Sequence, residues 1–241
     1  MTIQVFENEE QVALAGAALI AAELLQDPYT VLGLPTGSTP IGIYRELIRM
    51  FENGVISFAE ASAFNLDEYI GLDPDHEQSY NYFLHENFIN HVNFRAENVR
   101  LVQGLAVNAN EECEQYEQDI TDAGGIDLQL LGIGRNGHIG FNEPAAWFEK
   151  TTHVVDLAAD TIAANSRFFA NEDEVPRQAI SMGIGTIMDA EKIVLAATGS
   201  SKAEAIRAMC KGRIDPACPA SILQIHPNVT ILLDPAAAAL I

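Results

Sequence analysis

Strand-like and helix-like segments alternate along this chain from one end to the other. Short apolar and β-branched runs predict strands, and stretches with apolar residues at helical spacing lie between them. The predicted strands are 3–6, 29–34, 61–65, 128–131, 154–157, 193–197 and 229–233. The predicted helices run from a cap at Asn8 to about 25, from about 40 to 53, from Ser79, over about 108–123, near 158–170 and over 201–211.

This alternation predicts an α/β fold with a mostly parallel, doubly wound (Rossmann-like) sheet and helices on both faces. No repeat, low-complexity tract or Pro/Ser linker divides the 241 residues, so we expect a single domain over 1–241. Ligands of such sheets bind beyond the carboxyl ends of the strands. The candidate motifs below all follow a predicted strand, which favours a single site at that edge.

The charge of the chain limits its partners. Thirteen Lys and Arg against 34 Asp and Glu give a net charge of −21, which argues against nucleic acid or an anionic membrane surface. No apolar run approaches the eighteen residues of a membrane helix, and the acidic start carries no export signal. The three cysteines form neither an even disulfide set nor a Cys-x-x-Cys pair. We therefore expect a cytoplasmic protein with a small-molecule partner.

The segment 132–144, Gly-Ile-Gly-Arg-Asn-Gly-His-Ile-Gly-Phe-Asn-Glu-Pro, carries the clearest chemistry. It places His138 and Glu143 on a glycine-rich turn, where a histidine and a carboxylate can form a proton-transfer pair. Its start also matches the dinucleotide-binding fingerprint, but that motif needs the third glycine to open a helix. Gly140 and Pro144 argue against a helix. The remaining alternative is a tight structural turn with an incidental histidine.

The segment 34–40, Leu-Pro-Thr-Gly-Ser-Thr-Pro, predicts a phosphate-binding loop before a helix. Hydroxyl groups and free backbone N–H groups at a helix N-terminus bind phosphate well. No lysine follows Gly37, so this is not a Walker A loop. The candidate binding residues are Thr36, Gly37, Ser38 and Thr39. An ordinary capped helix is the alternative.

Two further segments carry candidate phosphate-binding cations. Arg167 lies in Ala-Asn-Ser-Arg-Phe-Phe (164–169), and Lys202 lies in Gly-Ser-Ser-Lys-Ala (199–203). A guanidinium and an ammonium beside hydroxyl groups suit a phosphate. Taken singly, cations of this kind are more often surface residues than phosphate ligands.

Asp67 and Glu68 lie in Phe-Asn-Leu-Asp-Glu-Tyr (64–69), directly after a short predicted strand. A carboxylate there could remove a proton from carbon if burial or a neighbouring charge adjusted its pKa. The alternative is a pair of solvated acidic side chains. Metal binding is not expected, because His85 and His91 are six positions apart and not four, as a His-Glu-x-x-His site requires.

Together these five segments resemble, in order and spacing, those of the glucosamine-6-phosphate deaminase family. The resemblance implies conversion of glucosamine 6-phosphate and water to fructose 6-phosphate and ammonia, without metal or organic cofactor. It implies that His138 assists opening of the sugar ring, with Glu143 and Asn136 orienting it. It also implies that Asp67 moves the C2 proton to C1. The phosphate would lie on the 36–39 turn with Arg167 and Lys202.

The resemblance has departures as well as matches. Some members carry Asp where this chain has Asn136, and Asn cannot stabilise an imidazolium by charge, although its carbonyl can accept from a ring N–H. Relatives activated by N-acetylglucosamine 6-phosphate carry basic side chains where this chain has His153 and Val155. We therefore expect a non-allosteric member that is a monomer or small homo-oligomer. A lid over about 145–171 is also expected.

Two other functions remain open from the sequence. The 6-phosphogluconolactonase family shares the fold and a similar histidine turn, but its histidine precedes a Ser-Leu-Phe-Pro-type run where this chain has Phe-Asn-Glu-Pro (141–144). A sugar-phosphate-sensing domain is the second alternative. The charge of −21 and the lack of a DNA-binding segment weigh against it.

Overall fold

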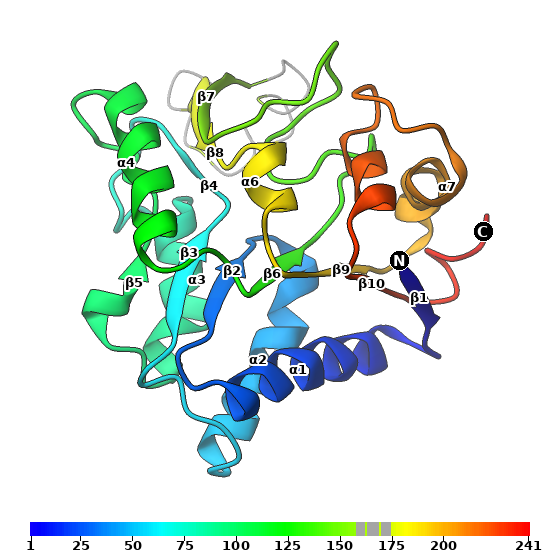
Figure 1. Cartoon of the computed structure of the whole chain (residues 1–241), viewed down its shortest axis with the longest axis horizontal. Helices are drawn as coiled ribbons and strands as arrows, with labels where there is room; N and C mark the ends of the chain where they lie inside the picture. The colour runs from blue at the N-terminus through cyan, green and yellow to red at the C-terminus, as the bar shows by residue number, and fades with distance from the viewer. Residues whose placement is uncertain (158–161, 163–168, 170–174) are drawn as a thin grey trace.

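Seven parallel strands form the central sheet of the protein, for which a computed structural model describes residues 1–157, 162, 169 and 175–241 (Figure 1). Their order across the sheet is β1-β10-β9-β6-β2-β3-β5. The strands are β1 (Thr2–Val5), β2 (Val31–Leu34), β3 (Ser62–Asn65), β5 (Val99–Arg100), β6 (Leu128–Leu131), β9 (Lys192–Ala197) and β10 (Val229–Leu233). The predicted mostly parallel α/β fold is confirmed.

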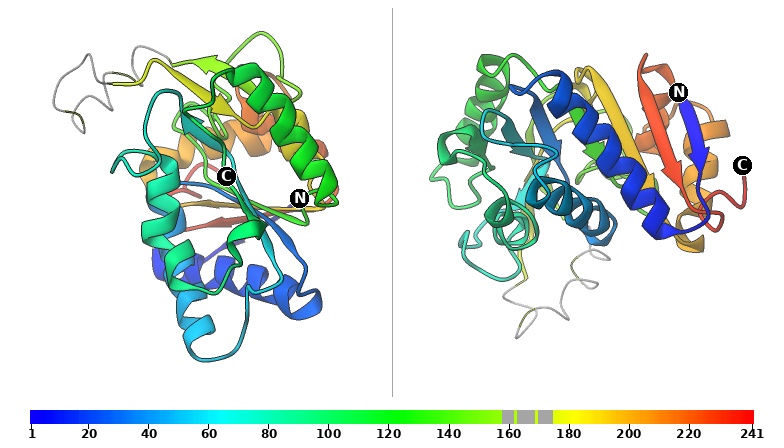
Figure 2. Two further views of the ribbon diagram at one scale, coloured as in Figure 1. Left: turned by 90° about the vertical axis from the view of Figure 1, so that its left-hand side faces the viewer. Right: turned by 90° about the horizontal axis from the view of Figure 1, so that it is seen from below.

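Helices cover both faces of this sheet (Figures 1 and 2). On one face lie α1 (Glu9–Gln26), α2 (Ser38–Glu52) and α3 (Tyr80–Asn87). On the other lie α4 (Ala109–Asp122), α6 (Ile184–Met188), α7 (Ala203–Lys211) and the 3-10 helix η6 (Pro219–Ile225). Shorter 3-10 helices are η1 (Ile89–His91), η2 (Ala96–Asn98) and η5 (Ser200–Lys202). All four residues of β2 and of β6 are buried, as expected for strands covered on both sides.

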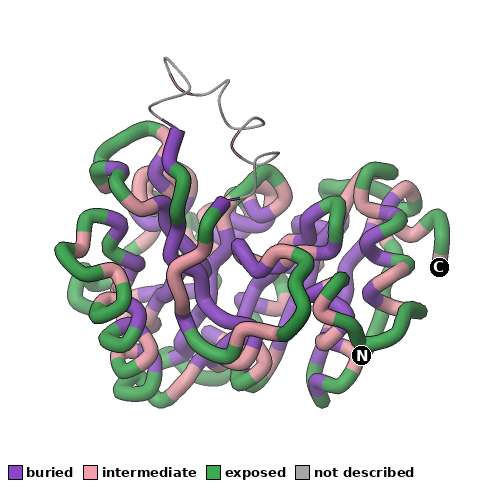
Figure 3. The backbone as a smooth tube through the Cα atoms, turned by 90° about the horizontal axis from the view of Figure 1, so that it is seen from above, coloured by how far each residue is buried: buried purple, intermediate pink, exposed green. Residues whose placement is uncertain are grey.

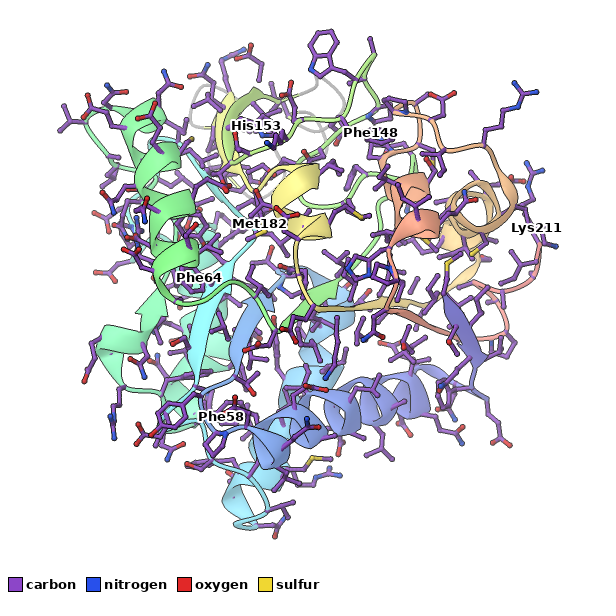
Figure 4. All side chains as sticks on the ribbon, viewed as in Figure 1. Phe58, Phe64, Phe148, His153, Met182 and Lys211 are labelled. Atoms are coloured by element: carbon purple, nitrogen blue, oxygen red, sulfur yellow. The ribbon has the colours of Figure 1, made fainter. Side chains whose placement is uncertain are left out.

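The apolar core is divided by the sheet into two parts. Phe58 packs with the α1, α2 and α3 side chains, whereas Phe64 and Met182 pack on the opposite face (Figure 4). The backbone of the central strands is buried almost throughout, and exposed residues gather at the periphery (Figure 3). This two-sided core holds the strand ends, and the loops that follow them, in fixed relative positions.

Three predicted helix starts are confirmed by their caps. The side-chain oxygen of Asn8 accepts a hydrogen bond from the backbone N–H of Gln11 at 2.9 Å. Ser79 accepts one from Tyr82 at 3.0 Å, and Asn108 caps α4 in the same way. Asn and Ser are favoured there because they satisfy N–H groups that have no partner inside the helix.

A second, three-stranded antiparallel sheet was not predicted. It consists of β4 (Asp67–Tyr69), β8 (Gln178–Ser181) and β7 (His153–Asp156), in the order β4-β8-β7. The predicted strand at 154–157 is β7, and it pairs here with β8 and not within the parallel sheet. A local apolar pattern does not specify the partner of a strand, and β4 is only three residues long with two carboxylates.

Part of the predicted organisation lies outside the described residues. The helix predicted near 158–170, the predicted lid from 158 onward and Arg167 fall there, apart from residues 162 and 169. Within the described part of the chain, no helix is long and apolar enough to cross a membrane.

Candidate active site

One cavity of about 280 Å³ lies at the carboxyl ends of the strands, where the loops after β2, β3, β6 and β9 meet. This is the position at which open α/β sheets bind their ligands. The predicted residues on its wall are Thr36, Gly37, Ser38, Thr39, Asp67, His138 and Lys202. Asn136 and Glu143 are not on the wall but stand behind His138. Arg167 lies outside the described residues.

The imidazole of His138 is held against a carboxylate. Its Nδ1 lies 2.9 Å from Oε1 of Glu143, an ion pair whenever the ring is protonated. A Cβ on Gly134 would lie 2.4 Å from Nε2 of the same ring, so only glycine permits this close packing. Glu143 therefore faces one ring nitrogen, and the other edge of the ring lies along the loop that lines the cavity.

Asn136 acts on Glu143 and on the backbone, not on the imidazole ring. Its amide nitrogen donates a hydrogen bond to Oε2 of Glu143 at 2.5 Å, and its carbonyl accepts from the backbone N–H of His138 at 3.2 Å. The ring N–H acceptor role that the sequence allowed for this carbonyl is therefore wrong. Burial raises the pKa of Glu143, but its hydrogen bonds to His138 and Asn136 outweigh that effect, and the net pKa is below the ordinary value.

Hydrogen bonds fasten the histidine turn to the small sheet. The backbone N–H of Phe141 donates to Oγ of Ser181 in β8 at 3.0 Å. The side-chain amide of Asn142 donates to the carbonyl of Met182 at 2.8 Å. Ser181 is also the register partner of Asp67, so the same strand, β8, holds both the histidine turn and the predicted base.

Asp67 is buried in β4, with 6% of its surface exposed, and its side chain reaches the cavity. Asn65, at the end of β3, donates its amide hydrogen to the backbone carbonyl of Asp67 at 2.7 Å, which fixes the crossing from the large sheet to the small one. Burial, and then the charge of Glu68, raise the pKa of Asp67 to about 8. An ionised carboxylate in this place is a strong base for its type.

Glu68 is also buried, so the alternative of two solvated carboxylates is wrong. Its side chain accepts hydrogen bonds from the backbone at the start of α3. One indirect signal for this arrangement was present in the sequence, the helix start predicted at Ser79. Two carboxylates with different environments therefore stand side by side.

The loop after β2, which also lines the cavity, has the features of a phosphate site. Gly37, with a φ of 102°, stands at the N-cap of α2 and turns the chain so that the first-turn N–H groups border the cavity. The hydroxyl of Tyr44, buried in α2, donates to the carbonyl of Pro35 at 2.6 Å and holds this loop in place. Partial positive charge at the helix start therefore faces the cavity.

Lys202 also lines the cavity. Its ammonium donates a hydrogen bond to the carbonyl of Ile133 at 2.6 Å, on the histidine turn. Burial, and then the positive charge of Arg135, lower its pKa. Lys202 is thus placed to meet an anion while joined to the turn that carries His138.

Tyr80 and Phe141 also line the cavity, and the sequence did not identify them. Their rings are stacked, with centroids 5.7 Å apart and planes 5° from parallel. The hydroxyl of Tyr80 lies 3.2 Å from that of Tyr69. In a sequence, an aromatic residue that lines a cavity cannot be told apart from one that packs in the apolar core. Within the described residues, no group of histidine, cysteine and carboxylate side chains is arranged to hold a metal ion.

The fold and the cavity define an α/β enzyme whose site brings a buried carboxylate and an imidazole together with a helix N-terminus and a lysine. The chain matches the family model of glucosamine-6-phosphate isomerases/6-phosphogluconolactonase over residues 7–232, and it belongs to that family. It is 53% identical, over all of its length and 95% of the relative, to glucosamine-6-phosphate deaminase of Thermoanaerobacter pseudethanolicus.

Solved structures agree with this membership. One, a monomeric glucosamine-6-phosphate deaminase, has a TM-score of 0.96 and 42% identity, with each chain covered completely. Another, 6-phosphogluconolactonase from Leishmania guyanensis, has a TM-score of 0.75 and 22% identity over 98% of this chain and 97% of the other. The second likeness concerns the fold alone.

Proposed function

We propose that this protein is a glucosamine-6-phosphate deaminase, which converts glucosamine 6-phosphate and water to fructose 6-phosphate and ammonia. The observation that carries the proposal is the shared cavity. A buried carboxylate, Asp67, and an imidazole, His138, line the same cavity as the N-terminus of α2 and Lys202. The high identity to deaminases over the full chain supports the same activity.

The first step in the proposed mechanism is opening of the sugar ring. This step moves a proton from the C1 hydroxyl to the ring oxygen, and an imidazole can take and return a proton near neutral pH. Glu143, 2.9 Å from Nδ1 of His138, fixes the orientation of the ring. Asn136 in turn holds Glu143.

The second step is transfer of hydrogen from C2 to C1. The carboxylate of Asp67 removes the C2 proton of the open-chain aldehyde, a proton of the substrate's own C2 ammonium group passes to O1, and the product is an enolamine. The same carboxyl group then gives the proton to C1, which leaves an iminium at C2. Water adds to that carbon and ammonia departs, so that the ketone of fructose 6-phosphate remains. A base whose pKa is raised to about 8 suits removal of a proton from carbon.

The phosphate of the substrate is proposed to bind beside the first turn of α2. The first turn of α2, residues 36–39 and Lys202 provide N–H groups, hydroxyls and a positive charge there. Binding energy from the phosphate, which does not react, positions C1 and C2 against Asp67. Arg167, outside the described residues, stays a prediction for the same role.

The proposal extends to the oligomeric state and the cellular location of the protein. The solved relative with 42% identity is monomeric, which supports a monomer here. All three cysteines are free thiols, which suits the reducing cytoplasm.

The test is an assay of ammonia release from glucosamine 6-phosphate by the purified protein, with glucosamine and 6-phosphogluconolactone as comparisons. We expect ammonia and fructose 6-phosphate in equal amounts from the first, and a far lower rate from unphosphorylated glucosamine. Hydrolysis of the lactone without release of ammonia from the amino sugar would identify a lactonase. Binding of the sugar phosphate without turnover would identify a sensor.

A further inference from the structure

Glu68 is a buried carboxylate next to Asp67 that the proposed mechanism does not use. Only 2% of its surface is exposed. Its Oε1 accepts hydrogen bonds from the backbone N–H groups of Tyr69 at 2.8 Å and Tyr80 at 3.0 Å. Its Oε2 accepts from the backbone N–H of Asn81 at 2.8 Å. Three donors of this kind favour the ionised form of a carboxylate away from water.

These hydrogen bonds join two elements of the fold. Tyr69 belongs to β4, the strand that carries Asp67, whereas Tyr80 and Asn81 form the first turn of α3. The first N–H groups of a helix have no partner within it, and the helix dipole favours negative charge at that end. Glu68 therefore fastens the start of α3 to the strand of the proposed base.

Tyr80, whose backbone N–H is bound by Glu68, is part of the cavity wall. It lines the cavity together with Asp67. Its ring stacks on Phe141, which follows His138 on the catalytic turn. A shift of the first turn of α3 would thus change the space beside both proton-transfer groups.

Glu68 also acts on Asp67 through its charge. The pKa of Asp67 is raised first by burial and second by the negative charge of Glu68. Burial raises the pKa of Glu68 itself, while the N–H groups of Tyr80 and Asn81 oppose that rise. The pKa of the Tyr80 phenol is raised by burial, so this neighbour stays neutral. The titratable side chains around Asp67 on the surrounding elements are Glu68, Tyr69, Tyr80, Tyr116, His138 and Lys202.

We propose that Glu68 is a positioning residue for proton transfer by Asp67, an inference that rests on the proposed function. It anchors the first turn of α3, with Tyr80, to the strand of the base. It also keeps a second negative charge beside the Asp67 carboxylate, which makes that carboxylate a stronger base.

The test separates the effect of the negative charge of Glu68 from the effect of the length of its side chain. Glu68→Gln removes the charge and nearly keeps the shape, whereas Glu68→Asp keeps the charge and shortens the side chain. The matched control is Asp127→Asn, because Asp127 accepts the backbone N–H of Val31 at 2.6 Å but precedes β6, at the opposite end of the sheet.

Titration of Asp67 is followed by NMR in protein labelled with ¹³C at the aspartate carboxyl carbons, and its signal is assigned by its loss in Asp67→Asn. We expect Glu68→Gln to move the midpoint to lower pH by about one unit. Glu68→Asp and Asp127→Asn should leave the midpoint unchanged within a few tenths of a unit. An unchanged midpoint in Glu68→Gln would overturn the proposal.

The pH profile of ammonia release provides the second measurement. Glu68→Gln should lower the limiting kcat about tenfold and move the acid limb in the same direction as the NMR midpoint. Glu68→Asp should lower kcat but leave the acid limb of the pH profile at the same pH. This variant keeps the negative charge and loses only the side-chain length that positions the start of α3. Failure of both variants to fold would make Glu68 a residue of the fold alone and overturn the proposal. The NMR titration needs no turnover, so a protein without deaminase activity would refute the proposed function while Glu68 is still tested.

Discussion

At the level of single residues, the environment of Asp67 sets the strength of the proposed base. A carboxyl group in water has given up its proton well below neutral pH, and such a weak base removes a proton from carbon poorly. Burial in β4 raises the pKa of Asp67 to about 8 and thereby increases its strength as a base. The protein loses some stability for this, since an ionised carboxylate is held away from water.

Asp67→Asn should abolish deamination while the variant still binds sugar phosphate. The amide keeps the shape of the side chain but cannot accept the C2 proton. We expect a loss of at least a thousandfold in kcat, about 4 kcal/mol or more in transition-state stabilisation. Steady-state rates and calorimetric binding of fructose 6-phosphate measure the two effects. Turnover near that of the wild type would remove Asp67 from the mechanism.

The same substitution should stabilise the protein in a pH-dependent way. Because the pKa of Asp67 is raised on folding, the stability linked to its proton is complete below the unfolded value, near 4, and is lost as pH rises through about 8. Asn has no proton to lose. The gain in free energy of unfolding should therefore grow from pH 5 to pH 9, reaching on the order of 5 kcal/mol. Urea unfolding of both proteins at several pH values checks this, and a pH-independent difference would contradict it.

Lys202→Ala should mainly raise KM for glucosamine 6-phosphate. Loss of a direct cation–phosphate contact costs roughly 1.5–3 kcal/mol, about ten- to a hundredfold in KM. Lys211→Ala is the control, because Lys211 is an exposed lysine near the end of α7 (Figure 4). Equal losses for glucosamine and its phosphate would mean that Lys202 serves the fold, through its hydrogen bond to Ile133, and not the phosphate.

At the level of elements, the parallel sheet was predictable and the small sheet was not. β6 and β10 match the predicted bounds, because buried strands read as continuous apolar runs bounded by turns. β4 and β8 have no such run, and the burial of β4 depends on its pairing with β8, far along the chain. The sequence located the candidate residues Asp67 and His138, but it could not place Asn136 behind Glu143, because hydrogen-bond direction depends on the folded turn.

Tyr44→Phe should loosen the phosphate-binding loop. The variant keeps the buried ring but leaves the carbonyl of Pro35 without its 2.6 Å hydrogen bond. An unsatisfied buried carbonyl costs about 1–2 kcal/mol. We expect a lower free energy of unfolding by that amount and a KM raised several-fold, with kcat nearly unchanged. Tyr29→Phe, at an exposed tyrosine, is the control, and an equal effect in both variants would count against a role for the Tyr44 hydroxyl.

At the level of the whole molecule, an anionic effector has little to bind beside the catalytic turn. A second cavity, of about 220 Å³, lies behind Glu143 and is lined by β7. Its described lining includes Glu149 and Asp156 and contains no lysine or arginine. His153 in β7 is the basic side chain there (Figure 4). Carboxylates repel a phosphate, so this cavity gives no favourable binding energy with which to shift an equilibrium between two states.

The protein should therefore show hyperbolic kinetics with glucosamine 6-phosphate. Addition of N-acetylglucosamine 6-phosphate should not activate it, and sedimentation should show a monomer at assay concentrations. Initial rates over a range of substrate concentrations, with and without the acetylated sugar, measure this. A sigmoidal curve that becomes hyperbolic on addition of that ligand would prove the expectation wrong.

The pairing of the first strand with the last has a consequence for synthesis of the chain. β1 forms hydrogen bonds with β10 alone, where Thr2 is the register partner of Thr230 (Figure 1). At ribosomal rates of about 5–20 residues per second, the first strand waits roughly ten to forty-five seconds for its partner. All four β1 residues are exposed even in the finished sheet. While it is unpaired, β1 therefore exposes little more apolar surface to water than it does in the folded protein. The sheet is therefore completed only after β10 has been synthesised, by a strand, β1, that can be left unpaired until then.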